Sequence, residues 1–147
     1  MEGIKPYISF TGNCREAMEF YKEKLGAVVL FSQTWGESPM AEHAAGKGDM
    51  IMHCSIKIGD SVIMASDNPS EGENATIVGN NISLALGTKD VADAERTFEA
   101  MSDGAKITMP IQETFWAERF GMLTDKFGIN WMFNCDKPEA DHAKATA

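Results

Sequence analysis

Residues 6–26 read PYISFTGNCREAMEFYKEKLG, a short β-rich stretch followed by a helical pattern. Asn13 stands where a helix N-cap is expected, and Glu16 follows three residues later, as in a capping box. Apolar side chains then recur at helical spacing from residue 14 to residue 25 and form one stripe. Gly26 is typical of a left-handed helix end. The stretch therefore predicts a strand, a turn and an amphipathic helix.

The same order of signals returns in residues 82–104, ISLALGTKDVADAERTFEAMSDG. Here Asp90 is the expected N-cap and Gly104 the expected stop. Ala94 corresponds to Ala17 when the two stretches are aligned. The chain therefore repeats its own pattern.

Each half continues with a predicted β-hairpin. Residues 52–67 turn at Gly59 and Asp60, a strong turn pair, and residues 121–136 turn at residues 125–128, where Gly128 is expected to have a positive φ. Extra residues in the first half fall in the polar loop 36–49.

Each half thus predicts the order βαβββ, and neither half buries its apolar faces alone. We expect an α+β fold in which the two modules pack together. Over residues 1–147 this makes one domain, with module one at 4–69, a linker at 70–81, module two at 82–136 and a flexible tail at 137–147.

Composition excludes several classes of protein. A formal net charge of −9, with scattered basic residues, does not suit binding to a nucleic-acid backbone. The longest apolar run, residues 27–31, is too short to span a membrane, and the N-terminus lacks the pattern of a secretion signal. The three cysteines have no CxxC spacing and indicate reduced thiols. We therefore expect a cytoplasmic protein without nucleic-acid or membrane partners.

Several longer motifs resemble the PhnB-like branch of the vicinal-oxygen-chelate (glyoxalase/bleomycin-resistance/dioxygenase) superfamily. The resemblance covers residues 5–136 and depends most on the run QETFWA. The motifs are PYISF (6–10), GNC (12–14), AMEFY (17–21), QETFWA (112–117), Gly121, TDKFG (124–128) and WM (131–132).

The resemblance implies a mixed sheet that is curled around a cup, with the helices outside. The cup holds a small-molecule site, and the protein is a homodimer. Members of the superfamily range from metal-dependent isomerases and dioxygenases to proteins that only bind an antibiotic, so the fold does not decide the function. A methyltransferase label also attached to PhnB-like proteins is not favoured, because no Gly-rich loop follows a strand to hold a nucleotide cofactor.

The resemblance also gives the positions of the four metal ligands in metal-dependent relatives. They fall on Pro6, Ile63, Ser83 and Met132. Proline and isoleucine offer no donor atom, and a hydroxyl with a thioether does not suit Zn²⁺, Ni²⁺ or Fe²⁺. We therefore expect no metal at the family site and no cofactor.

Strand alternation predicts which side chains face the cup. Residues 52, 54, 56 and 58 form an apolar face expected to lie under a helix, so Ile51, His53, Ser55 and Lys57 point into the cup. By the same reasoning Ser83, Met132 and Asn134 face it. The first strand stays open, because the ligand positions turn Pro6, Ile8 and Phe10 inward whereas apolar patterning turns Ser9 inward.

His53 is the candidate catalytic residue, as a general base, although a hydrogen-bonded pocket histidine without catalytic duty is the simpler interpretation. Trp116 is expected to form an aromatic wall of the ligand site with Glu113 at its rim, or instead to cap the core. Trp35, at the end of a strand, has the same two interpretations. Cys14 lies in a first helical turn, where the helix dipole would lower its thiol pKa, although a small first-turn residue is the simpler interpretation.

Three functions follow. The first is a small-molecule-binding protein without the usual metal, which either sequesters its ligand or performs acid/base chemistry through His53. The second is a metal-dependent lyase, isomerase or dioxygenase with displaced ligands such as His53 and Glu113. The third is a structural or regulatory dimer whose cup is filled by its own side chains.

Overall fold

The computed structural model describes residues 1–43 and 46–138, so the predicted flexible tail beyond residue 138 lies outside the described residues. The α+β class is confirmed, because two helices accompany two mixed four-stranded sheets. The chain divides into two compact units between Ile77 and Val78, and these units contain the predicted modules one and two. None of the helices in the described part of the chain combines the length and apolarity needed to cross a bilayer.

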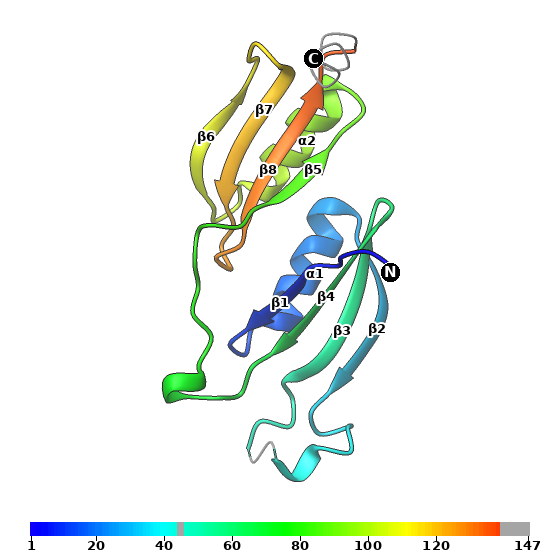
Figure 1. Ribbon diagram of the computed structural model, residues 1–147, viewed down its shortest axis with the longest axis vertical. Helices are drawn as coiled ribbons and strands as arrows, with labels where there is room; N and C mark the ends of the chain where they lie inside the picture. Colours follow the sequence, from blue (N-terminus) through cyan, green and yellow to red (C-terminus); the bar gives the residue numbers. More distant parts are fainter. Residues whose placement is uncertain (44–45, 139–147) are drawn as a thin grey trace. The chain divides into compact units, whose positions relative to one another are not determined.

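Module one has a four-stranded sheet with the strand order β1-β4-β3-β2, in which β1 runs parallel to β4 and the other neighbours are antiparallel (Figure 1). Its elements are β1 (Tyr7–Phe10), α1 (Cys14–Leu25), β2 (Val28–Thr34), the 3-10 turn η1 (Ala41–His43), β3 (Ile51–Ile58) and β4 (Ser61–Asp67). A second 3-10 turn, η2 (Gly72–Asn74), follows in the linker.

Module two repeats this arrangement with the order β5-β8-β7-β6, and β5 runs parallel to β8. Its elements are β5 (Leu84–Gly87), α2 (Val91–Met101), β6 (Lys106–Gln112), β7 (Ala117–Thr124) and β8 (Asn130–Asp136). The predicted βαβββ repeat is therefore confirmed in both halves. The longer connection in the first half is confirmed too, since residues 35–50 join β2 to β3 whereas only residues 113–116 join β6 to β7.

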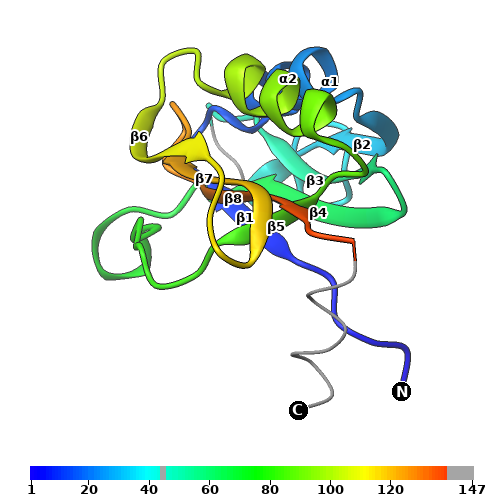
Figure 2. The same ribbon diagram turned by 90° about the horizontal axis from the view of Figure 1, so that it is seen from above.

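In each module the helix packs against one face of its own sheet (Figures 1 and 2). Cys14 and Tyr21 of α1 are buried against this face, and the Cys14 sulfur lies 3.7 Å from the sulfur of Cys54 on β3. In module two, the ring of Phe98 on α2 meets the ring of Phe133 on β8 edge-on, with centroids 5.4 Å apart. We call the opposite side of each sheet its open face.

The start of α1 is held differently from the prediction. Asn13 occupies the N-cap position, but its side chain makes no capping hydrogen bond. Instead, the buried carboxylate of Asp67, at the end of β4, accepts hydrogen bonds from the backbone N–H groups of Gly12, Cys14 and Ile51 at 2.8, 3.0 and 2.9 Å. Asp67 therefore joins the β1–α1 turn to the start of β3. The helix ends at Gly26, with φ of 69°, as predicted.

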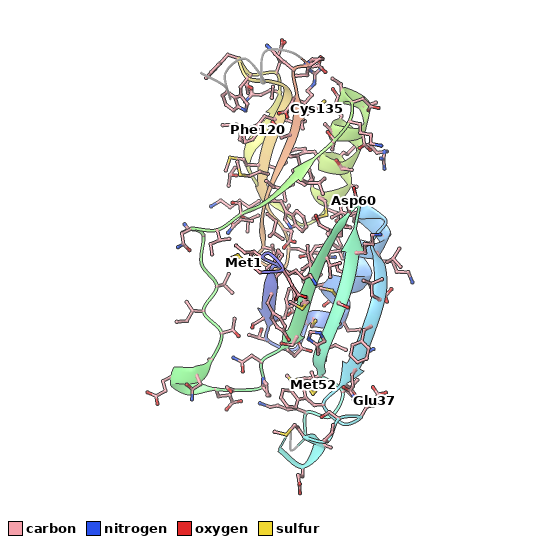
Figure 3. The ribbon with its side chains drawn as sticks, turned by 45° about the vertical axis from the view of Figure 1, so that its right-hand side comes forward. Met1, Glu37, Met52, Asp60, Phe120 and Cys135 are labelled. Atoms are coloured by element: carbon pink, nitrogen blue, oxygen red, sulfur yellow. The ribbon has the colours of Figure 1, made fainter. Side chains whose placement is uncertain are left out.

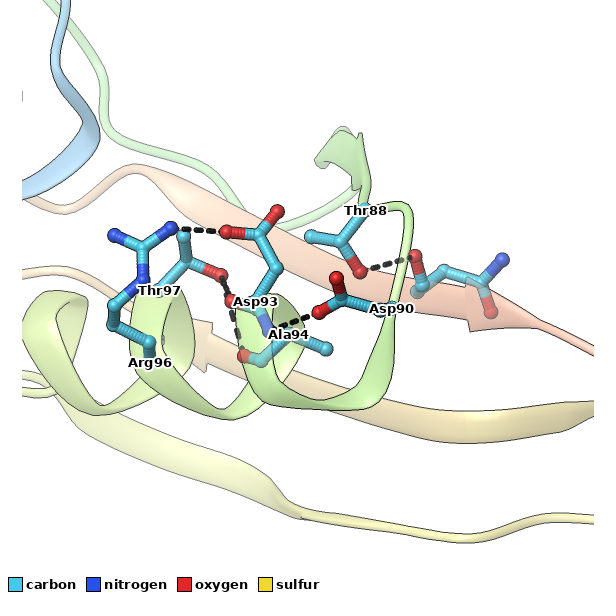
Figure 4. Close-up of polar contacts among 7 residues, drawn as sticks. Thr88, Asp90, Asp93, Ala94, Arg96 and Thr97 are labelled. Atoms are coloured by element: carbon cyan, nitrogen blue, oxygen red, sulfur yellow. Dashed lines mark hydrogen bonds and ion pairs between the residues drawn. The ribbon is translucent and has the colours of Figure 1, made fainter.

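The start of α2 agrees with the prediction, because the Asp90 carboxylate accepts a hydrogen bond of 2.7 Å from the N–H of Asp93 (Figure 4). Such a cap stabilises a helix by about 1 kcal/mol. The sheet approaches α2 closely at Gly121 on β7, where a Cβ atom would lie 2.7 Å from the ring of Phe98. Only glycine fits this contact without displacement of the ring.

Candidate functional site

The open face of module one carries a cluster of polar and aromatic side chains. In the strand register, Tyr7 pairs with Met64, Met64 with Ser55, and Ser55 with Phe31, so these four residues form one row across the sheet. His53 lies on the same face, two residues from Ser55 on β3. Tyr7 and Phe31 are each half exposed.

His53 is bonded within this cluster rather than isolated. Its Nδ1 atom lies 3.0 Å from the Tyr7 hydroxyl, and its ring centroid lies 5.6 Å from that of Tyr7 and 6.0 Å from that of Phe31. The other ring nitrogen, Nε2, is the atom through which the imidazole could exchange a proton with a bound molecule. His53 and Ser55 therefore lie on the face where the sequence predicted them.

For the first strand, the structure agrees with the orientation that apolar patterning predicts. Tyr7 contacts His53 on the open face, and Phe10 is buried on the opposite face. Pro6 precedes β1 with the parity of Phe10 and so is not on the open face.

Two other predicted cup residues are on the wrong face. Ile63 pairs with the fully buried Ile56 and is itself 6% exposed, so it faces the helix. Ile51 is also buried, because Met52 is an extra residue opposite β2 that interrupts the alternation of β3.

The four positions implied for a divalent metal do not fit one. Pro6 and Ile63 have no donor atom and do not belong to the open face, and their open-face neighbours are Tyr7, Val62 and Met64. Ser83 and Met132 add one hydroxyl and one thioether, a poor set for a hard or borderline ion. Within residues 1–43 and 46–138, no three His, Cys, Asp or Glu side chains are grouped so that they could hold a metal.

The open face of module two carries a row of methionines. Met109 on β6 pairs with Met122 on β7, which pairs with Met132 on β8, and Met132 pairs with Ala85 on β5. The three methionine side chains are half buried. Thioether side chains are flexible and polarisable, so this row is an adaptable apolar surface.

An aromatic and amide row lies beside the methionines. Phe120 on β7 pairs with Asn134 on β8. Figure 3 labels Phe120 and, on β8, Cys135, the residue that follows Asn134. The Trp116 ring meets the Phe120 ring at a centroid distance of 5.4 Å and an angle of 65°. Trp116, Met132 and Asn134, three of the predicted ligand residues, therefore belong to one face of module two.

Asn134, on this face, has a side-chain oxygen that lacks a hydrogen-bond partner among the described residues. Its Nδ2 atom donates a hydrogen bond to the Asp136 carboxylate, which orients the side-chain amide. Its Oδ1 atom is buried and, in the described part of the chain, has no hydrogen-bond partner. A buried carbonyl without a partner costs about 1–3 kcal/mol, so a donor supplied by a bound molecule would be favoured here.

The remaining predicted site residues are placed less centrally. Ser83 immediately precedes β5 and is half exposed. Glu113 is exposed and forms an ion pair of 3.5 Å with Lys137. Trp35 donates its indole N–H to the backbone carbonyl of Asp67 at 3.3 Å, which favours a structural role. A pocket common to His53 and Trp116 stays a prediction, because the two residues belong to different modules.

Cys14 is not an activated thiol, in agreement with the simpler interpretation as a small first-turn residue. Its hydrogen bond with Cys54, its burial and the nearby Asp67 carboxylate all raise the pKa of the Cys14 thiol. These effects outweigh the helix dipole, which would lower the pKa. Of all these influences, only the dipole can be recognised from the sequence. Cys14 is therefore part of the core between α1 and β3.

A cavity of about 490 Å³ lies at the start of α1, away from the predicted residues. Its lining includes Gly12, Arg15, Glu16, Glu19, Asp49 and Met50. Arg15 reaches across it to the backbone carbonyl of Asp49 at 3.3 Å. The buried carboxylate in the lining, Asp67, already accepts three backbone N–H hydrogen bonds, so the cavity adds no candidate chemistry.

Sequence reasoning missed several residues of the open faces, among them Tyr7 and Phe120. Tyr7 was not assigned to the site because its strand had two opposing interpretations, and only the partner strand decides between them. Phe120 was missed because a phenylalanine in a strand looks like core, although the alternation of β7 about Gly121 would have placed it opposite the helix.

Comparison with known proteins agrees with this architecture. Residues 3–133 match the family model described as Glyoxalase/Bleomycin resistance protein/Dioxygenase superfamily. Protein YjdN of Escherichia coli is 34% identical over 145 residues, which cover 92% of this chain and 97% of YjdN.

Two solved structures have the same fold. The crystal structure of protein PA1353 from Pseudomonas aeruginosa is 41% identical, with a TM-score of 0.81 over 92% of this chain and 98% of that chain. A Bacillus cereus structure titled putative 3-demethylubiquinone-9 3-methyltransferase, PhnB protein, is 20% identical, with a TM-score of 0.74 over 91% of this chain and 99% of that chain, and this likeness concerns the fold alone. The chain therefore belongs to the glyoxalase/bleomycin resistance protein/dioxygenase superfamily and has a PhnB-like protein among its structural neighbours.

Proposed function

We propose that this protein binds a small organic molecule on the open face of module two, without the divalent metal that some members of the superfamily use. The observation that carries the proposal is the buried Oδ1 atom of Asn134, which has no hydrogen-bond partner among residues 1–43 and 46–138. A protein that keeps such an atom gives up stability, and binding of a hydrogen-bond donor would recover it.

The surroundings of Asn134 suit a flat apolar ligand. Phe120 lies directly opposite on β7, and Trp116 packs against Phe120. Met122 and Met132 extend the apolar surface to the next row. A few polar groups within a mainly apolar and aromatic surface are the usual composition of a small-molecule site.

The test is a panel of small aromatic compounds with and without N–H or O–H donors, titrated against the wild type and Asn134→Leu. Leucine keeps the approximate volume of asparagine and removes the acceptor. We expect the variant to lose about tenfold in affinity for donor-bearing compounds only. Asn80→Leu, at an exposed position of the same unit, is the matched control. Equal affinities of Asn134→Leu and wild type for every compound that binds would refute the proposal.

Trp116→Ala gives a second measurement on the same site. Loss of its apolar contact should weaken binding by about 1–3 kcal/mol for compounds of either kind, because the indole offers surface rather than an acceptor. Unchanged affinity would return Trp116 to the core-capping role.

Acid/base catalysis through His53 is the second candidate function. It is favoured by the 3.0 Å contact between His53 Nδ1 and the Tyr7 hydroxyl, which orients the ring on the open face of module one. In an enzyme, His53→Ala would abolish turnover with little change in substrate affinity. In a binding protein, the same substitution would change affinity alone.

A further inference from the structure

The orientation of the Asn134 amide limits what a ligand on module two must offer. Because Nδ2 donates to Asp136, Oδ1 is the atom left to face a partner, and it only accepts hydrogen bonds. The ligand must therefore bring an N–H or O–H group. This step rests on the proposed function, since it concerns the same site.

The charges near Asn134 favour a cation over an anion. Asp136, two residues along β8, has the same strand parity and is exposed. Lys137, the next residue, is paired with Glu113 at 3.5 Å. Lys106 lies on a more distant row, opposite Thr124, with the methionine row between it and Asn134. The chain as a whole has a formal net charge of −9, which adds a long-range preference for cations.

The apolar part of the surface also suits a cation that is flat and aromatic. Aromatic ring faces attract positive charge within about 6 Å, and the partly exposed Trp116 offers one such ring, packed edge-on against the buried Phe120. Thioether side chains adapt to a planar ring system, and Met122 and Met132 lie beside Phe120 and Asn134 in the register.

We infer that the open face of module two selects aromatic cations that carry an N–H donor, with the donor on Asn134 Oδ1 and the positive charge near Asp136. A neutral ring of the same shape satisfies the apolar surface but leaves the acceptor unpaired. An anionic ring meets the Asp136 carboxylate. The selectivity therefore comes from an acceptor and a carboxylate on one edge of an apolar site.

Four acridine probes separate these contributions in calorimetric titrations of the full chain at mildly alkaline pH. They are 9-aminoacridine (a cation with N–H donors), N-methylacridinium (a cation without a donor), acridine (neutral) and acridine-9-carboxylate (an anion). We expect 9-aminoacridine to bind about tenfold or more tightly than acridine, N-methylacridinium to fall between them, and the carboxylate to bind most weakly.

Asp136→Asn tests the charge separately, because the variant keeps a side-chain oxygen that can accept from Asn134. It should lower the affinity for both cations about threefold and leave that for acridine unchanged, whereas Asp60→Asn, on the β3–β4 turn of module one, should change none of them (Figure 3).

The outcomes distinguish this inference from the proposed function. Acridine binding as tightly as 9-aminoacridine, or cation affinities indifferent to Asp136→Asn, would overturn the cation selectivity while small-molecule binding stands. Failure of all four probes to bind would also overturn the selectivity. Failure of every compound in the wider panel would overturn the proposed function itself.

Discussion

The Tyr7 hydroxyl lies 3.0 Å from Nδ1 of His53, which joins the first strand of module one to the third across β4. When the imidazole is neutral, the hydroxyl can donate to Nδ1 or accept from it, according to the tautomer. Because a phenol O–H is a better donor than acceptor, we expect the ring hydrogen on Nε2. This contact decides which nitrogen of His53 is presented to a ligand.

The first prediction concerns this tautomer. Long-range proton–nitrogen spectra, recorded where the His53 imidazole is neutral, should show its hydrogen on Nε2, because Nδ1 is occupied by the Tyr7 hydroxyl. In Tyr7→Phe the donor is lost and the two tautomers should both be populated. A wild-type His53 with its hydrogen on Nδ1 would mean that the imidazole donates to the Tyr7 oxygen, and would contradict this assignment of the donor.

The second prediction concerns the buried carboxylate of Asp67. Asp67→Ala removes the acceptor of three backbone N–H groups and should lower the free energy of unfolding by about 2–4 kcal/mol in urea titrations. Asp60 is exposed on the β3–β4 turn of the same module, so Asp60→Ala is a control expected within about 0.5 kcal/mol of wild type. Similar losses in the two variants would mean that Asp67 has no special role.

The third prediction concerns the contact between α2 and its sheet. Gly121→Ala places a methyl group 2.7 Å from the ring of Phe98 and should cost about 1–3 kcal/mol of unfolding free energy. Gly87→Ala, on β5 of the same sheet, meets nothing within 4 Å and should not destabilise the protein. The comparison separates overpacking from a general intolerance of alanine in these strands.

The fourth prediction concerns the stability of the ligand-free protein. Asn134→Leu removes a buried carbonyl that has no partner, so it should raise the free energy of unfolding by about 1 kcal/mol even though it weakens binding. A residue retained for structure would behave in the opposite way. A variant less stable than wild type by more than about 1 kcal/mol would therefore indicate that Asn134 supports the fold rather than a ligand.

Much of the fold followed from the sequence because both modules repeat strong local signals. The helical stripe before Gly26, the cap at Asp90 and the turn at Gly128, with φ of 89°, depend only on neighbouring residues. The faces of β3 from His53 onward and of β8 were also predictable, since apolar and polar side chains alternate there.

The rest depends on contacts between distant segments. β4 is apolar on both faces, so alternation could not place Ile63, and the extra residue Met52 displaced Ile51. Asp67 reaches α1 from the end of β4, whereas local rules point to Asn13. The face on which Asn134 lies was predictable. Whether its side-chain oxygen finds a hydrogen-bond partner depends on all the surrounding residues, which the sequence does not place. The homodimer and the cytoplasmic location remain predictions.

The most direct test of the central claim uses the chain's ten methionines as reporters. With methionine methyl groups labelled by carbon-13, a compound that binds the open face of module two should shift the signals of Met109, Met122 and Met132. The signals of Met18 and Met101, which are buried side chains of α1 and α2, should stay in place. These shifts should weaken in Asn134→Leu at the same compound concentration. Shifts confined to other methionines, or the same shifts in Asn134→Leu, would contradict a ligand site built around Asn134.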